Sequence, residues 1–204
     1  MNNGFLYNAV KIILDNLRHL TLVEWVKRIG LYLWCKNPEE TQQRINCRSN
    51  IIDGFNIFKW LLIILLLINH VSNSFWTCVV WYFIITNIYS YFYHHIWSDS
   101  AIEIDITSSD RARRRFFLLM LAISYSEICF AYLYRLSYVN EFSWSDKATI
   151  LKSIWYSVSN SFAANYDTVK PISELGNSVS MIQLIITIIF VTIIISKSIP
   201  EIKN

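Results

Sequence analysis

Glycine and proline are scarce in this chain of 204 residues, which has four glycines and three prolines. Both residue types interrupt helices, so their scarcity favours long helical segments. Charge is also low, because charged residues make up 16% of the chain against roughly 25% in an ordinary soluble domain. Hydrophobic residues make up 54%, and the mean hydropathy is +0.34. This composition predicts an all-α membrane protein.

Signatures of catalysis and of metal binding are missing as well. The four cysteines are nowhere spaced as C-x-x-C, so we expect free thiols rather than a zinc or redox site. The sequence has no P-loop, no H-E-x-x-H motif, no nucleophile elbow and no glycine-rich nucleotide loop. We therefore expect no enzyme, no catalytic residue, no cofactor and no metal. The net charge of +3 needs no nucleic-acid partner, since membrane proteins gather Lys and Arg in cytoplasmic loops.

Four apolar segments are candidates for membrane-spanning helices. A helix needs about 20 mainly apolar residues to cross a hydrocarbon core of roughly 30 Å. Lipid selects helices because every backbone polar group must be satisfied inside the segment. The predicted spans are residues 57–71, 75–92, 116–138 and 179–199.

The distribution of Lys and Arg predicts the orientation of these spans. Residues 1–59 hold eight such residues, the turn at 72–74 holds none, and the loop at 94–115 holds four arginines. The loop at 139–178 has three lysines, offset by four acidic residues. Because Lys and Arg favour the cytoplasmic side, we expect both termini and the 94–115 loop to be cytoplasmic. The membrane is then the plasma membrane, which is the inner membrane in a bacterium.

Residues 20–34 have the pattern of a helix that lies along a membrane surface. Apolar residues recur there at helical spacing: Leu22, Val26, Ile29 and Leu33. Charged residues lie off this stripe: Glu24, Lys27 and Arg28. The pattern favours an interfacial helix on the cytoplasmic leaflet. A small soluble helical cap, packed on itself, is the alternative.

The 139–178 loop carries a more specific pattern. Tyr156-Ser157-Val158 opens a run that Pro171 closes, and Leu175-Gly176 precedes the last apolar segment. In spacing and at both ends, this run resembles the pore loop of tetrameric potassium channels, which reads roughly Y-S-V-V-T-F-T-T-V-G-Y-G-D-I-x-P. Tyr166 falls at the position of the filter tyrosine. The resemblance covers about residues 116–199 and implies a re-entrant pore helix and filter between two membrane helices, assembled as a homotetramer.

The middle of the run departs from that family. The filter sequence T-V-G-Y-G-D is replaced here by Ala163, Ala164, Asn165, Tyr166, Asp167 and Thr168. The family's glycines let the filter strand adopt backbone angles that other residues resist. Without them we do not expect potassium selectivity, which requires stacked rings of carbonyl oxygens. A ring of Asp167 carboxylates would instead favour cations with little discrimination, so the resemblance implies a cation pore or gated leak.

The last apolar segment has one partly polar face. Its members are spaced by three, four and four residues: Ser180, Gln183, Thr187 and Val191. These side chains either line a pore or join helices to one another within lipid, and the sequence leaves both alternatives open. From Val191 onward the face is apolar, which predicts a dewetted constriction in the cytoplasmic half.

Glu127 is an ionisable residue in the middle of a predicted span. Such a group costs roughly 3 kcal/mol or more at the bilayer centre and usually marks function. We expect it to pair with Asn87, Gln183 or His70, either as a sensor or as a hydrogen-bonded link between helices. Arg135 lies closer to the external end of the same span, where its side chain can extend toward water.

A basic cluster precedes the third predicted span: Arg111, Arg113, Arg114 and Arg115. It is expected to bind anionic lipid or to dock a soluble cytoplasmic partner protein. The second alternative leads to a different function, a non-conducting membrane sensor or scaffold. In size, span count and general character the chain also resembles the membrane subunit of the Kiwa phage-defence system, which works with a soluble DNA-binding subunit. That resemblance implies a role in bacterial antiviral defence without direct nucleic-acid binding.

These interpretations divide the chain into five parts. They are a cytoplasmic amphipathic region (1–50), two spans (51–93), a basic cytoplasmic loop (94–115), the channel-like module (116–199) and a cytoplasmic tail (200–204).

Overall fold

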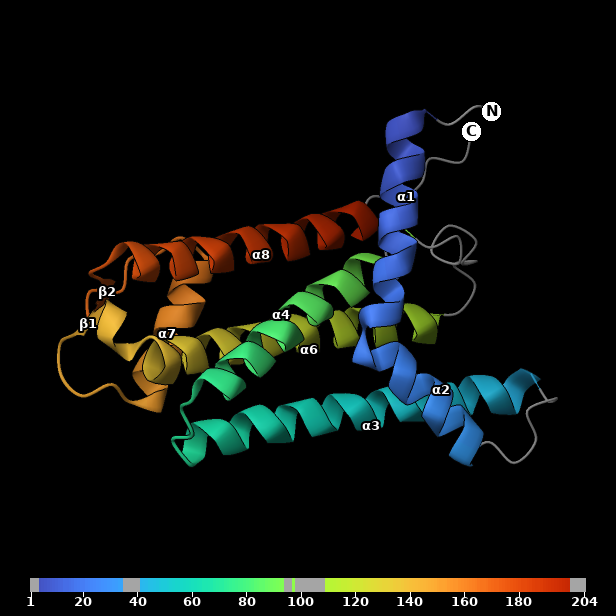
Figure 1. Cartoon of the computed structure of the whole chain (residues 1–204), viewed down its shortest axis with the longest axis horizontal. Coiled ribbons are helices and arrows are strands. Elements are labelled where there is room, and N and C mark those ends of the chain that lie inside the picture. Colours follow the sequence, from blue (N-terminus) through green and yellow to red (C-terminus); the bar gives the residue numbers. More distant parts are fainter. Residues whose placement is uncertain (1–3, 35–40, 94–96, 98–108, 199–204) are drawn as a thin grey trace. The chain divides into compact units, whose positions relative to one another are not determined.

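The computed structural model describes residues 4–34, 41–93, 97 and 109–198, and most of them are helical (Figure 1). The predicted tail and most of the 94–108 stretch lie outside these residues. The α-helices within them are α1 (Phe5–Leu17), α2 (Leu22–Trp34), α3 (Thr41–Ile68), α4 (Ser74–Phe92), α6 (Ser109–Tyr132), α7 (Ile150–Ser161) and α8 (Glu174–Ser198). The chain forms two compact units, Met1–Leu62 and Ile63–Asn204, here called the N-terminal and C-terminal units.

Among the described residues, three helical segments are long and apolar enough to cross a membrane: Cys47–Ile68, Phe116–Ser137 and Glu174–Ile193. They correspond to the first, third and fourth predicted spans, and their length and composition indicate an integral membrane location. The second predicted span, 75–92, is helical as α4 but is not one of these three. Its Trp, Tyr, Thr, Asn and Ser residues alternate with apolar ones and lower its hydropathy.

Two helices begin earlier than the sequence predicts. Helix α3 begins at Thr41, so it includes ten residues that we expected in the amphipathic region. Helix α6 begins at Ser109, so Arg111 to Arg115 belong to its first turns rather than to a loop. Neither early stretch contains glycine or proline, so nothing in the local sequence stops the helix from extending.

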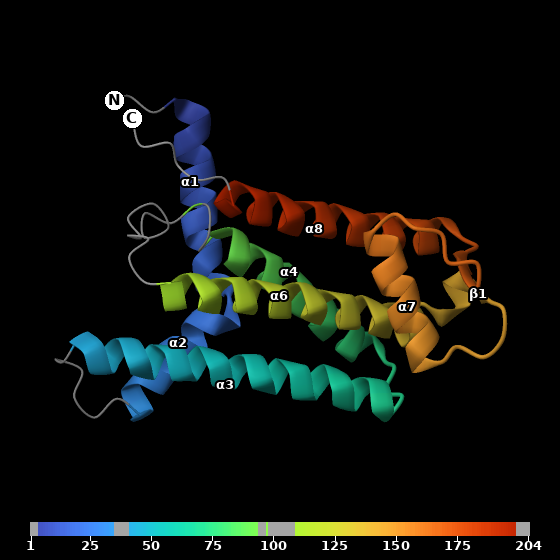
Figure 2. The same ribbon diagram turned by 180° about the vertical axis from the view of Figure 1, so that it is seen from behind.

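In the C-terminal unit, α4, α6 and α8 run alongside one another, and α7 crosses between α6 and α8 (Figure 2). Apolar side chains from all three long helices are buried between them, among them Val80, Phe130 and Phe190. Polar groups add specific links. Asn87 Nδ2 of α4 donates to the Ala122 carbonyl of α6 at 3.0 Å. This bundle positions α7.

Helix α7 lies where the resemblance implies a pore helix. By residue type, Ser145 or Asp146 could also serve as its N-cap. The observed N-cap is Thr149, whose Oγ1 accepts from the Lys152 amide at 3.3 Å. At 12 residues, the helix is about 18 Å long. That length covers roughly half of a bilayer core.

Helix α7 ends in a Schellman turn. The Ala163 amide donates to the Asn160 carbonyl at 2.9 Å, and the Ala164 amide donates to the Ser159 carbonyl at 2.8 Å. Ala163 has a φ of 52°, which is the left-handed conformation that this turn requires and that glycine usually supplies.

A short antiparallel pair of strands, which the sequence did not predict, joins the segments before and after α7. Strand β1 (Phe142–Trp144) pairs with β2 (Val169–Pro171), with Ser143 opposite Lys170. The start of α8 packs against the residue before β1. A Cβ atom on Gly176 would lie 2.5 Å from the Glu141 carbonyl oxygen, so this close approach requires glycine. The predicted all-α fold therefore gains a small two-stranded sheet.

Candidate functional site

Six side chains from α6, α7 and α8 form a hydrogen-bonded cluster inside the C-terminal unit. We call it the polar core, and it consists of Glu127, Ser157, Asn160, Ser161, Gln183 and Thr187. The Glu127 carboxylate accepts from Ser161 Oγ at 2.6 Å, from Ser157 Oγ at 2.8 Å and from Gln183 Nε2 at 2.7 Å. Both carboxylate oxygens therefore have donors, which offsets the cost of removing the group from water.

Gln183 connects the three helices of the polar core. Its side chain is fully buried. Its Oε1 accepts from Tyr134 Oη at 2.5 Å and from Asn160 Nδ2 at 2.9 Å, while its Nε2 also lies 2.9 Å from the Ser157 carbonyl oxygen. Because an unsatisfied polar group is costly in a low-dielectric interior, these bonds fix the depth and rotation of α7 relative to α6 and α8.

The predicted polar face of α8 points into this cluster. Ser180 Oγ lies 3.0 Å from Tyr156 Oη, and Thr187 Oγ1 donates to Ser161 Oγ at 3.2 Å. Together with Gln183, these residues contact α7 of the same chain, whereas Val191 is exposed. Contacts of this kind join helices to one another. Within the single chain Ser180 and Gln183 are buried, and Thr187 is half-buried.

Glu127 and Arg135 each have a defined set of partners. Of the three partners predicted for Glu127, Gln183 contacts it, while Asn87 bonds to the Ala122 carbonyl. Arg135 does not extend into water as predicted, because it is 8% exposed. Arg135 lies in a π-helical turn, Leu133–Ser137, at the end of α6.

Arg135 links the ends of three helical elements. Its Nη1 donates to the Leu67 carbonyl at the end of α3 at 3.1 Å, and its Nε donates to the Ala148 carbonyl just before α7 at 3.0 Å. Its Nη2 lies 3.2 Å from Nδ1 of His70. The guanidinium therefore satisfies one carbonyl group at the C-terminal end of α3 and binds the backbone just before α7.

The filter-like loop connects the end of α7 to β2. Ala163, Ala164, Asn165 and Asp167 are exposed, and Tyr166 is half-buried. Asn165 Nδ2 donates to Asp167 Oδ1 at 3.0 Å, and Asp167 forms an ion pair with Lys170 at 3.2 Å. Among the described residues only His70 and Ala163 combine a side chain with a positive φ, so Asn165 and Asp167 do not imitate the backbone of the missing glycines.

Contacts of Ser161 establish the depth at which this loop begins. Glu127, its partner, lies near the middle of the span Phe116–Ser137. Thr187, its other partner, lies within the span Glu174–Ile193. Residues 162–168 are neither helix nor strand. They therefore begin at the level of Glu127 and Thr187 along the bundle and lead back to β2.

The sequence analysis missed the residues of α7 that bind Glu127. A signal for them was present, because Ser153, Ser157 and Ser161 recur every four residues and so share one face of a helix. The fully buried Ser153 and Ser157 show that the face is directed inward.

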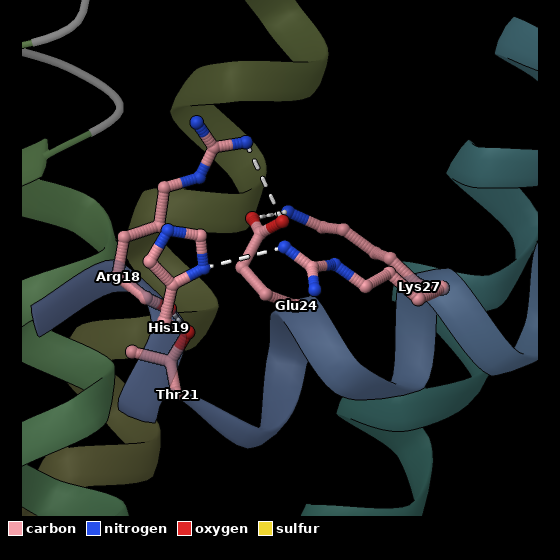
Figure 3. Close-up of polar contacts among 6 residues, drawn as sticks. Arg18, His19, Thr21, Glu24 and Lys27 are labelled. Carbon is pink, nitrogen blue, oxygen red and sulfur yellow. Dashed lines mark hydrogen bonds and ion pairs between the residues drawn. The ribbon is translucent and has the colours of Figure 1, made fainter. Parts of the chain in front are cut away.

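A second polar cluster lies in the N-terminal unit, where η1 (Arg18–Leu20) leads into α2 (Figure 3). Lys27 Nζ lies 2.8 Å from Glu24 Oε1, and Arg18 Nη2 lies 3.4 Å from Glu24 Oε2. Glu24 and Lys27 are both buried. We call Arg18, Glu24 and Lys27 the charged cluster.

Opposing effects act on the two buried members of the charged cluster. Burial raises the pKa of Glu24, but the hydrogen bond and charge of Lys27, with the charge of Arg18, outweigh it and lower the pKa from 4.5 to about 2. Burial lowers the pKa of Lys27 from 10.5, and its bond to Glu24 opposes that change. Glu24 is therefore ionised at neutral pH, and its carboxylate favours the charged form of Lys27.

Two further predicted features can be placed in part. Arg113 and Arg114 are exposed in the first turns of α6, whereas the side chains of Arg111 and Arg115 lie outside the description. Within the residues that the structure describes, no group of three or more His, Cys, Asp and Glu side chains is arranged to hold a metal ion.

A comparison with protein-family models finds no match, and comparisons with curated proteins and with solved structures find no significant match either.

Proposed function

We propose that copies of this protein assemble into a cation-conducting membrane pore in which residues 162–168 line the conduction path. The observation that carries this proposal is the depth of the non-helical segment. It follows directly on Ser161, whose hydroxyl bonds to Glu127 near the middle of a 22-residue span. The segment then returns to β2 over the outer half of the bundle.

Backbone of this kind is not stable against lipid. Each unsatisfied N–H or C=O group costs several kcal/mol in hydrocarbon, and most residues of the segment are exposed in the single chain. Non-helical backbone at membrane depth is tolerated where it is buried in protein or lines water. An assembly that surrounds these loops with water and with neighbouring copies meets that requirement, and the homotetramer of the pore module that the sequence resembles is such an assembly.

Acidic chemistry in the loop supports cations as the conducted species. Asp167 would contribute one carboxylate per copy, and such rings favour cations without fine discrimination. Its ion pair with Lys170 reduces that charge, so cation preference is expected to be moderate. Asn165 and Asp167 stand where the potassium-channel filter has its two glycines. Their side chains support a pore that is not potassium-selective.

The proposed topology includes α4 as a fourth span. This helix has 19 residues, and at a rise of 1.5 Å per residue it is about 28 Å long, close to the thickness of a hydrocarbon core. It packs along α6 and α8. Four spans place both termini in the cytoplasm, in agreement with the distribution of Lys and Arg.

Planar bilayer recordings of the purified protein test the pore. Wild-type protein should carry current with a reversal potential that favours cations in a salt gradient, and Asp167→Asn should reduce that preference. Asp146→Asn is the matched control, because Asp146 is 80% exposed in the same external loop and pairs with Lys152, as Asp167 is 79% exposed and pairs with Lys170. Intact oligomers that remain silent at every voltage would overturn the proposal.

A non-conducting sensor that signals to a soluble partner is the second candidate. The exposed Arg113 and Arg114 at the start of α6 favour it, since a basic surface at the cytoplasmic face can dock an acidic protein. The membrane subunit of an anti-phage defence system would act in this way. Pull-down from a bacterial host with Arg113→Gln and Arg114→Gln, against Lys147→Gln in the external loop as control, tests this candidate. An unchanged set of partners would exclude these arginines as the docking site.

A further inference from the structure

The N-terminal unit has an inverted distribution of polarity. Large apolar side chains of α1 and α2 are exposed, whereas Glu24 and Lys27 of α2 are buried. Eight of these side chains are more than half exposed: Phe5, Leu6, Ile12, Ile13, Trp25, Ile29, Tyr32 and Leu33. In a water-soluble helical domain the charged residues face solvent and the apolar stripe faces the core.

Helix α2 shows the inversion along a single helix. Its buried positions recur every three residues and include Glu24, Lys27 and Gly30. Gly30 faces the Ile51 side chain of α3, so closely that an added Cβ would lie 2.8 Å from Ile51 Cδ1. The apolar positions Trp25, Ile29 and Leu33 are exposed. The apolar stripe of α2 thus faces away from the interior of the N-terminal unit.

We propose that the cytoplasmic leaflet of the membrane covers this apolar face, with acyl chains against α1 and α2 and anionic headgroups at the exposed cations Lys11 and Arg28. This extends the surface-helix prediction for residues 20–34 to α1, and it does not depend on whether the protein conducts. Interfacial helices of this kind bury an apolar face about 5–10 Å into the headgroup and acyl boundary.

Chain continuity favours lipid as the occupant. Helix α2 ends at Trp34, and the membrane span of α3 begins at Cys47. Seven extended steps from Trp34 to Thr41 reach at most about 24 Å, and the helical stretch from Thr41 to Cys47 adds about 9 Å. The apolar face is therefore tethered within about 33 Å of the point at which the chain enters the bilayer.

The charges of the unit are compatible with an anionic surface. Glu24 accepts from Lys27 at 2.8 Å inside the unit, so this carboxylate is neutralised away from the headgroups. Lys11 and Arg28 remain exposed, and each basic residue near an anionic membrane surface contributes about 1 kcal/mol. Residues 4–34 contain four basic side chains, Lys11, Arg18, Lys27 and Arg28, against two acidic ones, Asp15 and Glu24, so this part of the chain is net positive.

Spin labels on the full-length protein in liposomes of phosphatidylcholine and phosphatidylglycerol test the proposal. In a background without native cysteines, Ile13→Cys, Ile29→Cys and Arg28→Cys are labelled separately, and collision rates with oxygen and with a water-soluble nickel chelate are compared. Labels at positions 13 and 29 should collide more with oxygen than with the chelate. The adjacent control at position 28 should show the reverse order.

Two other results would overturn the proposal. A higher chelate rate at positions 13 and 29 means that the face is in water. Immobile labels that neither reagent reaches mean that protein covers the face, either a second copy or the C-terminal unit. If a labelled variant fails to purify as the parent does, a photoreactive benzoylphenylalanine at position 29 or 28 replaces the label. Cross-links to lipid at 29 and not at 28 support the proposal, and cross-links to protein at 29 reject it.

Discussion

Gln183 Nε2 lies 2.7 Å from Oε2 of Glu127, so α8 donates directly to the carboxylate in the middle of α6. The same amide group lies 2.9 Å from the Ser157 carbonyl of α7. One fully buried side chain therefore holds a half-length helix between two membrane spans. Gln183 therefore helps to set the orientation of α7 and the starting depth of the filter-like loop, together with the bonds of Ser157 and Ser161 to Glu127.

Replacing Gln183 by leucine should destabilise the C-terminal unit by about 3 kcal/mol, because buried polar groups of Glu127, Tyr134 and Asn160 lose a partner. Thr192→Val is the control on the same helix, because Thr192 is exposed and its hydroxyl bonds to the Ile188 carbonyl of its own helix. Thermal unfolding in detergent should show a clear loss for Gln183→Leu and a small change for Thr192→Val. Equal effects would mean that the polar core does not stabilise the bundle.

Gly176→Ala should destabilise the junction between α8 and the strand pair by about 1–3 kcal/mol, the usual cost of overpacking. The new Cβ would meet a backbone oxygen, which cannot rotate away as a side chain can. Gly54→Ala is the matched control, because a Cβ there meets nothing within 4 Å, and alanine is favoured over glycine in a helix by up to about 1 kcal/mol. The two variants should therefore shift the unfolding temperature in opposite directions.

Ala163→Gly should stabilise the protein by about 1 kcal/mol, since a residue with a side chain pays roughly that amount for a left-handed conformation. Ala164→Gly serves as the comparison, because Ala164 does not have a positive φ and gains nothing from glycine. A rise in unfolding temperature for the first variant alone is expected. A fall for Ala163→Gly would mean that the turn after α7 has a different backbone conformation.

Glu24→Gln should destabilise the N-terminal unit by about 3 kcal/mol, because Lys27 would then be a buried charge without its counter-charge. Adding Lys27→Met should recover most of the loss, since a buried ion pair can often be replaced by apolar residues at little cost. The four unfolding temperatures of wild type, both single variants and the double variant form a mutant cycle. No recovery in the double variant would contradict a direct coupling between these residues.

The contribution of Glu24 should also depend on pH. Its pKa is lowered in the folded state, from 4.5 to about 2, so the stabilisation is complete above about pH 4.5 and is lost as the pH falls through 2. The stability difference between wild type and Glu24→Gln should therefore be constant from pH 5 to neutrality and shrink toward pH 2. A difference that already disappears by pH 4 would mean that the ion pair does not form.

The apolar helices could be predicted from the sequence because their signal is local. Runs without glycine, proline or charge specify helices in lipid wherever they occur, and three predicted spans lie in helices long and apolar enough to cross a membrane. Helix α4 was also predicted as a span but is not among these helices, because Asn87, Trp81 and other polar or aromatic residues dilute its hydropathy. The boundaries of α3 and α6 were wrong because polar helical turns outside the membrane have no apolar pattern to mark them.

The candidate site could be predicted only in part because its contacts join distant segments. The sequence indicated that Glu127 and Gln183 are unusual within apolar runs, and the structure brings them together. The sequence did not indicate what the polar face with Ser180 and Thr187 packs against. A polar stripe has the same spacing whether it faces water or another helix. The β1–β2 pair was missed because each strand has three residues, too few for a period-two pattern.

The polar core also constrains how the protein is made. Helix α6 is synthesised before α7 and α8, yet its Glu127 carboxylate obtains its donors from Ser157, Ser161 and Gln183. Until those residues emerge, α6 presents an ionisable group with no donor from α7 or α8, at a cost of roughly 3 kcal/mol in the bilayer centre. Stable insertion of α6 is therefore completed by residues translated later, and a nascent chain truncated before residue 183 should be a better substrate for membrane quality control than the full-length protein.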